Sequence, residues 1–213
     1  MAQSDLTTNN FFDMATKGDA DQLSSLLGEQ SSADEVKRLV NAKNADGATG
    51  LMVAAEKGHA KVVTFLLEKG ANPNETCTRK IAGIEMGTSP IAKNCTKQSH
   101  FFRQGSTILT IGEVKSGYSP WLVACCEGRL DIVDLFVVNG AKIEQANGDG
   151  LTALIVAAHH GKVDVVRHLL SKGARTDPKT PGGKTALDAA TDAGNEEVVQ
   201  ILRQATANLA STT

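Results

Sequence analysis

The chain has 213 residues, of which 41% are hydrophobic and 22% are charged, and its formal net charge is −2. This balance excludes a global positive field that would attract nucleic acid or an anionic membrane. The apolar runs are also too short to cross a membrane as a helix.

Residues 8–43 predict a helical unit built around Gly18 and a further helix after Ser32. Apolar residues precede Gly18, and leucines follow it at helical spacing. Ser32 followed three positions later by Glu35 is the pattern of a helix N-cap with a capping box. We therefore expect an N-terminal capping repeat that carries one or two extra helical turns before Leu39.

Residues 44–74 predict a regular pair of helices that end at glycines. Gly47 opens this unit, Gly58 stands in its middle, and Gly70 stands near its end. Because glycine tolerates a positive φ, we expect Gly58 and Gly70 to end the first and the second helix. Paired valines and leucines between these two glycines favour a buried face on the second helix.

Residues 75–114 break this pattern. The interval from Gly47 to Gly117 is slightly longer than twice the regular interval that separates Gly117 from Gly150. A Thr-Ser-Pro segment after Gly87 is similar to the opening of a unit, but no second helix pattern follows, and residues 106–114 are rich in β-branched side chains. The segment is therefore either an insertion from a hairpin loop, with some strand character, or a degenerate repeat.

The rest of the chain predicts three further units whose opening glycines are equally spaced. A glycine opens each unit, and a second glycine follows at the same spacing that separates Gly47 from Gly58. The last helix carries several charged residues, as expected of a terminal unit with a polar outer face. The units and their opening glycines are 115–146 with Gly117, 147–179 with Gly150, and 180–207 with Gly183.

These recurring phrases resemble the ankyrin repeat, in which a T-P-L-x-x-A-A helix, a glycine and a V-V-x-x-L-L helix follow one another. The resemblance implies one all-α domain over residues 1–213, an ankyrin-repeat solenoid of helix-turn-helix and β-hairpin loop units with an irregular central insertion. It implies five repeats, or six if the central segment counts as one. The matching residues are Thr49, Leu51, Ala54 and Ala55, Ser119, Pro120 and Ala124, and Thr152, Leu154, Ala157 and Ala158.

The resemblance implies a protein–protein interaction module, acting through its concave groove as an intracellular adaptor, chaperone or assembly subunit. Such a protein is expected to be a monomer or a subunit of a larger complex. In this family, variable contacts lie at the hairpin tips and just before the middle glycine. The residues at those places are Glu56, Lys57, Tyr118, Glu127, Leu151, His159, His160, Lys184 and Asp192. Asn41 and Asn74 match an asparagine that is hydroxylated in some family members.

An alternative function rests on the central segment, which is basic. Residues 75–116 carry six basic and three acidic side chains, so residues 79–115 are also consistent with an RNA-associated or ribonucleoprotein-associated factor. Steep loss of affinity with salt would favour this alternative over a protein interface. A solvated loop is the simpler explanation of the same charges.

Nothing in the sequence predicts an enzyme, a metal site or a cofactor. The chain has neither a G-x-S-x-G sequence nor a complete phosphate-binding loop, since the segment before Lys184 lacks the required first glycine. His159 and His160 are adjacent on a helix and point about 100° apart, so they are poorly placed to chelate one ion. We expect Asp188 to form a local hydrogen bond instead.

The cysteines and the single tryptophan have structural explanations. The four cysteines lack C-x-x-C spacing and no signal peptide precedes the chain, which predicts free thiols and a cytoplasmic or nuclear location. Cys125 occupies a small, buried position of its repeat. Trp121 stands where the family has leucine, so it is expected either to fill space beside the central segment or to act as a binding hot spot. Tyr118 is expected to anchor a partner or to pack on the insertion.

Overall fold

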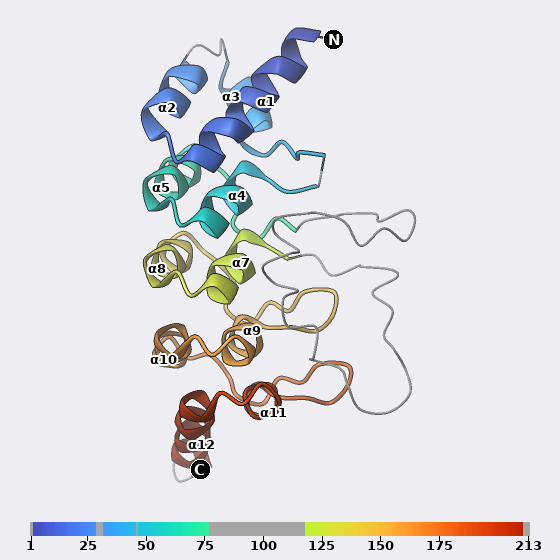
Figure 1. The fold of residues 1–213 in the computed structure, drawn as a ribbon, viewed down its shortest axis with the longest axis vertical. Helices are drawn as coiled ribbons and strands as arrows, with labels where there is room; N and C mark the ends of the chain where they lie inside the picture. The colour runs from blue at the N-terminus through green and yellow to red at the C-terminus, as the bar shows by residue number, and fades with distance from the viewer. Residues whose placement is uncertain (1, 29–31, 46, 77–117, 211–213) are drawn as a thin grey trace. The chain divides into compact units, whose positions relative to one another are not determined.

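The computed structural model describes residues 2–28, 32–45, 47–76 and 118–210, and these residues are helical apart from turns and loops (Figure 1). The expectation of an all-α fold is confirmed: no β-ladder occurs in the described residues, where Lys43 and Thr49 form a single isolated bridge. The helices are α1 (Ala2–Lys17), α2 (Ala20–Gly28), α3 (Ala33–Val40), α4 (Gly50–Lys57), α5 (Ala60–Glu68), α7 (Pro120–Glu127), α8 (Leu130–Val138), α9 (Ala153–His159), α10 (Val163–Ser171), α11 (Ala186–Asp192) and α12 (Glu196–Ala210).

The described residues fall into two compact units. The N-terminal unit contains α1 to α5, residues 118–124, which hold the first part of α7, and residues 131–141, which hold most of α8. The C-terminal unit contains residues 125–130 and the helices α9 to α12.

Within each unit, helices pair along the chain and the pairs then pack on one another. In the N-terminal unit α1 pairs with α2 and α4 with α5, while α1 packs on α4 and α2 on α5. In the C-terminal unit α9 pairs with α10 and α11 with α12, and the two pairs pack in the same way. The core therefore consists of small and branched apolar residues, such as Ala157 and Val166, which are fully buried between thin layers.

Positive φ angles at the glycines explain why each helix ends where it does. The middle glycine Gly58 has a φ of 81° and closes α4, and Gly161 has a φ of 64° after α9. At the other end, a threonine N-cap begins the first helix of a pair: the Oγ1 atom of Thr152 accepts a hydrogen bond from the backbone N–H of Ile155. These observations confirm the helix boundaries that the glycine spacing predicts.

The first repeat differs from the others in two ways. It contains the additional helix α3, whose N-cap Ser32 accepts a hydrogen bond from the backbone N–H of Glu35 at 3.2 Å. The extra helical segment is thus confirmed. Its first helix, α1, begins at Ala2, well before the boundary expected near residue 8, and the fully buried ring of Phe11 packs against the backbone of Gly50 in α4.

Two asparagines link successive hairpin loops of the N-terminal unit. The Nδ2 atom of Asn41 donates a hydrogen bond to the carbonyl oxygen of Gly70 at 3.3 Å. Asn74 makes the same contact with the carbonyl oxygen of Gly140, also at 3.3 Å. Because Gly70 and Gly140 both end the second helix of a repeat, the loop that holds Asn74 contacts the repeat that follows residues 77–117. This contact is consistent with an insertion rather than a degenerate repeat, and that interpretation stays a prediction.

The structure describes Cys125 and Trp121, for which the sequence predicted buried positions or a space-filling role. Cys125 is fully buried, as predicted, and Trp121 is 1% exposed. Cys77, Cys95 and the strand character expected over residues 106–114 lie outside the described residues.

Candidate functional site

Six of the nine candidate contact residues lie in the C-terminal unit. They belong to the ends of first helices and to the hairpin tips, as the family resemblance implies. These residues are Glu127, Leu151, His159, His160, Lys184 and Asp192, and we call them the tip surface. Glu56, Lys57 and Tyr118 lie in the N-terminal unit.

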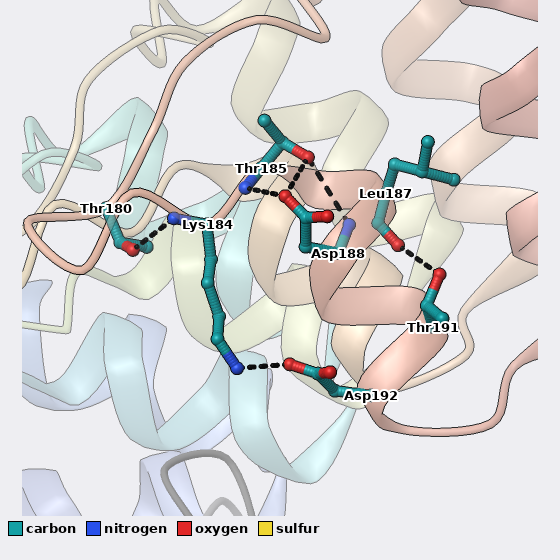
Figure 2. A network of polar contacts seen from close by, with 7 residues as sticks. All are labelled: Thr180, Lys184, Thr185, Leu187, Asp188, Thr191 and Asp192. Carbon is teal, nitrogen blue, oxygen red and sulfur yellow. Dashed lines mark hydrogen bonds and ion pairs between the residues drawn. The ribbon is translucent and has the colours of Figure 1, made fainter. Parts of the chain in front are cut away.

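An ion pair joins a hairpin tip to the end of the adjacent helix in the last repeat. The Nζ atom of Lys184 contacts the Oδ2 atom of Asp192, which is the last residue of α11 (Figure 2). Both side chains are partly exposed. The pair therefore fixes the position of two charged groups while leaving part of each in contact with solvent.

The same tip is held by a capping box around Thr185. The backbone N–H of Thr185 and its hydroxyl donate to Oδ2 of Asp188 at 2.9 and 2.7 Å, and the backbone N–H of Asp188 donates back to Oγ1 of Thr185 at 3.3 Å (Figure 2). The predicted local role of Asp188 is confirmed. These hydrogen bonds from Thr185 lower the pKa of the Asp188 carboxyl. Thr180 adds a further bond, accepting from the backbone N–H of Lys184 at 3.2 Å.

The imidazole of His159 lies close to this ion pair. Burial lowers its pKa, while a hydrogen bond to the backbone of Ala189 and the charge of Asp192 raise it and Lys184 lowers it. The fold therefore brings His159 of one repeat together with the charged pair of the next. These side chains are distant in the sequence, and the packing of α9 on α11 joins them.

His160 is the C-cap residue that follows α9, and its ring meets that of His159 edge to face. The ring centroids are 5.0 Å apart and the rings are inclined by 80°. Burial, followed by the charges of His159 and Lys162, lowers the pKa of His160 to about 4. His160 is therefore neutral near pH 7. It is half-buried.

The other candidates vary in exposure. Glu127 at the end of α7 and Leu151 at its hairpin are half-buried, and Tyr118 is half-buried as well. Lys57 is exposed, whereas Glu56 is only 5% exposed. The side chain of Glu56 therefore lies within the protein, although its position precedes the middle glycine.

A sequence comparison then identifies the family. The family described as "Ankyrin repeats (3 copies)" matches residues 14–77 and 121–213. The chain belongs to the ankyrin-repeat family. A comparison with curated proteins finds no match. Ankyrin repeats are in general protein–protein interaction modules.

In the described residues, no group of three or more histidine, cysteine, aspartate or glutamate side chains could hold a metal ion. A search of the same residues finds no helix that is long and apolar enough to span a membrane. The basic residues of the alternative function, 79–115, lie outside the described part of the chain.

A second feature of these ankyrin repeats was missed by the sequence argument. A shallow cleft of about 540 Å³, largely open to solvent, lies beside the additional helix α3 and is lined by both basic and acidic residues. The only sequence signal for it was the surplus of residues after Leu27, which predicted a helix but no cleft.

Proposed function

We propose that this ankyrin-repeat protein is an adaptor whose tip surface binds a polypeptide segment of a protein partner. The observation that carries the proposal is the convergence of His159 with the Lys184–Asp192 ion pair. Ion pairs and capping bonds order these groups before a partner arrives. Less conformational entropy is then lost on binding, so such order favours affinity.

The chemistry of the tip surface suits a polar segment with basic side chains. Glu127 and Asp192 are acidic and accessible to solvent, and the histidines carry no charge near pH 7 because their pKa values are lowered. A lysine or arginine of the partner would bind beside these carboxylates. The neutral imidazoles and Leu151 supply apolar contact area around them.

The test changes the charge of two tip-surface residues and of one matched control residue at a helix end. Glu127 is the last residue of α7 and Glu68 is the last residue of α5. The partner is first captured with the immobilised wild-type protein from nuclease-treated extract of its native cells, then identified and purified. Binding of that purified partner is measured for Glu127→Lys, Asp192→Asn and the control Glu68→Lys.

The proposal expects the two tip variants to bind the purified partner about tenfold more weakly or worse, a change of about 1.4 kcal/mol per tenfold. Glu68→Lys should bind as the wild type does. Circular dichroism must show equal helix content in all three variants. Equal binding by all of them would place the interface elsewhere, and loss of capture after nuclease treatment would favour the RNA-associated alternative.

A further inference from the structure

The additional helix α3 builds a surface that the other repeats lack. Its buried residues Leu39 and Val40 hold it against the N-terminal unit, while Lys37 and Arg38 remain at least partly exposed. The helix is followed by Asn41, whose side chain bonds to the next hairpin loop. As a result α3 and that loop form the two walls of the cleft, which is lined by Asp34, Lys37, Arg38, Asn41, Gly70, Asn72 and Glu75.

The cleft walls are held together by Asn41. Its Nδ2 atom donates to the carbonyl oxygens of Lys37 at 2.9 Å and Gly70 at 3.3 Å. Its Oδ1 atom accepts from the backbone N–H of Asn72 at 3.2 Å. The amide of Asn41 thus joins both walls, and the cleft is part of the ordered repeat rather than a gap between separate elements.

Most acceptors in the cleft are already used inside the protein. Glu75 forms an ion pair with Lys43 at 2.7 Å. The Oδ1 atom of Asn72 accepts from the backbone N–H of Asn74 at 3.0 Å. Asp34 lies in the first turn of α3, where the helix dipole stabilises a carboxylate.

Three donor groups remain available. In the described part of the chain, Lys37 and Arg38 form no ion pair, and no hydrogen bond uses the Nδ2 atom of Asn72. Two cations and one amide therefore line a cleft in which Glu75 is paired with Lys43 and Asp34 is the remaining carboxylate of the lining. Such a site favours a ligand that brings acceptors and negative charge.

We propose that this cleft binds an acidic peptide segment of a protein partner. One carboxylate accepts from the guanidinium of Arg38, a second accepts from the ammonium of Lys37, and the amide of Asn72 donates to the peptide backbone. A volume of about 540 Å³ accommodates a short segment of extended peptide. A nucleic-acid backbone is a poorer match, since its regularly spaced phosphates need a longer row of cations than Lys37 and Arg38 provide.

The experiment uses the full chain and four fluorescein-labelled probes, followed by fluorescence anisotropy. The probes are tetraglutamate, tetraglutamine and tetralysine peptides and a single-stranded oligonucleotide of the same net charge as tetraglutamate. The variant is Lys37→Ala with Arg38→Ala. A matched control changes two exposed cations of the C-terminal unit, Lys172→Ala with Arg203→Ala.

The proposal expects the wild type and the control to bind tetraglutamate, and the cleft variant to bind at least about tenfold more weakly. Tetraglutamine and tetralysine should bind weakly or not at all. Equal tetraglutamate affinity for the cleft variant and the wild type, or no binding by the wild type, would overturn the proposal. So would an oligonucleotide that binds as tightly as tetraglutamate and loses affinity equally in the cleft variant. Circular dichroism and the fluorescence of Trp121 must match the wild type, and Lys37→Gln with Arg38→Gln replaces the alanine variant if they do not.

Discussion

The side chain of Asn195 lies directly over Gly161 of the preceding repeat. A Cβ atom at Gly161 would come within 2.8 Å of Oδ1 of Asn195. From this position the Nδ2 atom of Asn195 donates to the carbonyl oxygens of Ala158 at 2.9 Å and His159 at 2.7 Å, which belong to the last turn of α9. A side chain of one repeat therefore donates hydrogen bonds to the carbonyl oxygens at the helix end of the preceding repeat.

The same relationship occurs in the N-terminal unit. The imidazole of His59 lies over Gly18, where a Cβ atom would come within 2.6 Å of Nδ1. Its Nε2 atom is 2.9 Å from the carbonyl oxygen of Thr16, near the end of α1. The middle glycine thus has two roles. Its positive φ lets the chain turn after the helix, and its lack of a Cβ atom leaves room for the side chain that bonds to the end of that helix.

This double requirement makes Gly161 more sensitive to substitution than Gly173. Both have a positive φ, 64° and 84°, but nothing lies within 4 Å of a Cβ atom at Gly173. Gly173→Ala should cost about 1–2 kcal/mol of unfolding free energy through backbone strain alone. Gly161→Ala should cost about 1–3 kcal/mol more, because Asn195 must move and leave carbonyls unpaired. Urea denaturation measures both, and equal losses would contradict this explanation.

Core truncation should be costly in the buried helix α9 of the C-terminal unit. Leu154 in α9 is 2% exposed. Leu154→Ala should lower the free energy of unfolding by about 2–5 kcal/mol, because the substitution leaves a cavity between thin helical layers. Arg203→Ala, on the exposed side of α12, should stay within about 0.5 kcal/mol. Urea denaturation of both variants gives these free energies. If Arg203→Ala lowers the free energy of unfolding as much as Leu154→Ala does, the assignment of buried and exposed faces is wrong.

Acidification should weaken the fold partly through His160. Burial lowers its pKa to about 4 from 6.5, the value of an unperturbed histidine. Between these values the unfolded chain binds a proton that the folded chain does not, so stability falls as the pH falls from about 6.5 towards 4. His160→Gln should remove part of this dependence. Histidine resonances followed by NMR titration give the pKa directly, and a value near 6.5 for His160 would contradict the prediction.

The Asn74–Gly140 hydrogen bond makes a prediction about residues 77–117. The flanking repeats contact one another through this bond. Replacing residues 79–114 with a short glycine-serine linker should therefore leave a protein that still unfolds cooperatively. Thermal unfolding monitored by circular dichroism provides the measurement. Loss of cooperative unfolding would favour the degenerate repeat, because a missing repeat removes interfaces on both of its sides.

The regular parts of this fold were predictable because each depends on local geometry. The spacing of Gly58 and Gly161 predicted left-handed helix ends, Ser32 predicted the start of α3, and Asp188 was expected to bond locally. Each of these features is set by neighbours within a few residues. The packing of one repeat on the next could also be predicted, because the sequence repeats and each repeat packs on its neighbour in the same way.

The remaining features depend on how side chains from different repeats meet. Nothing in the local sequence indicates that Glu56 is buried or that His160 is half-buried, since these depend on the surroundings of the helix ends. The cleft at α3 was missed for the same reason. It lies between α3 and a loop almost a full repeat further along the chain, to which Asn41 is hydrogen-bonded.

The most direct test of the tip surface as an interface places a photo-crosslinking benzoylphenylalanine at four helix ends. Two are in the tip surface, at Glu127 and Asp192, and two end second helices, at Glu68 and Ser171. After irradiation in native-cell extract, crosslinked products are identified by mass spectrometry. The account predicts that one and the same protein is crosslinked from Glu127 and Asp192, and from neither Glu68 nor Ser171. Crosslinking of that protein from Glu68 or Ser171 alone would contradict it.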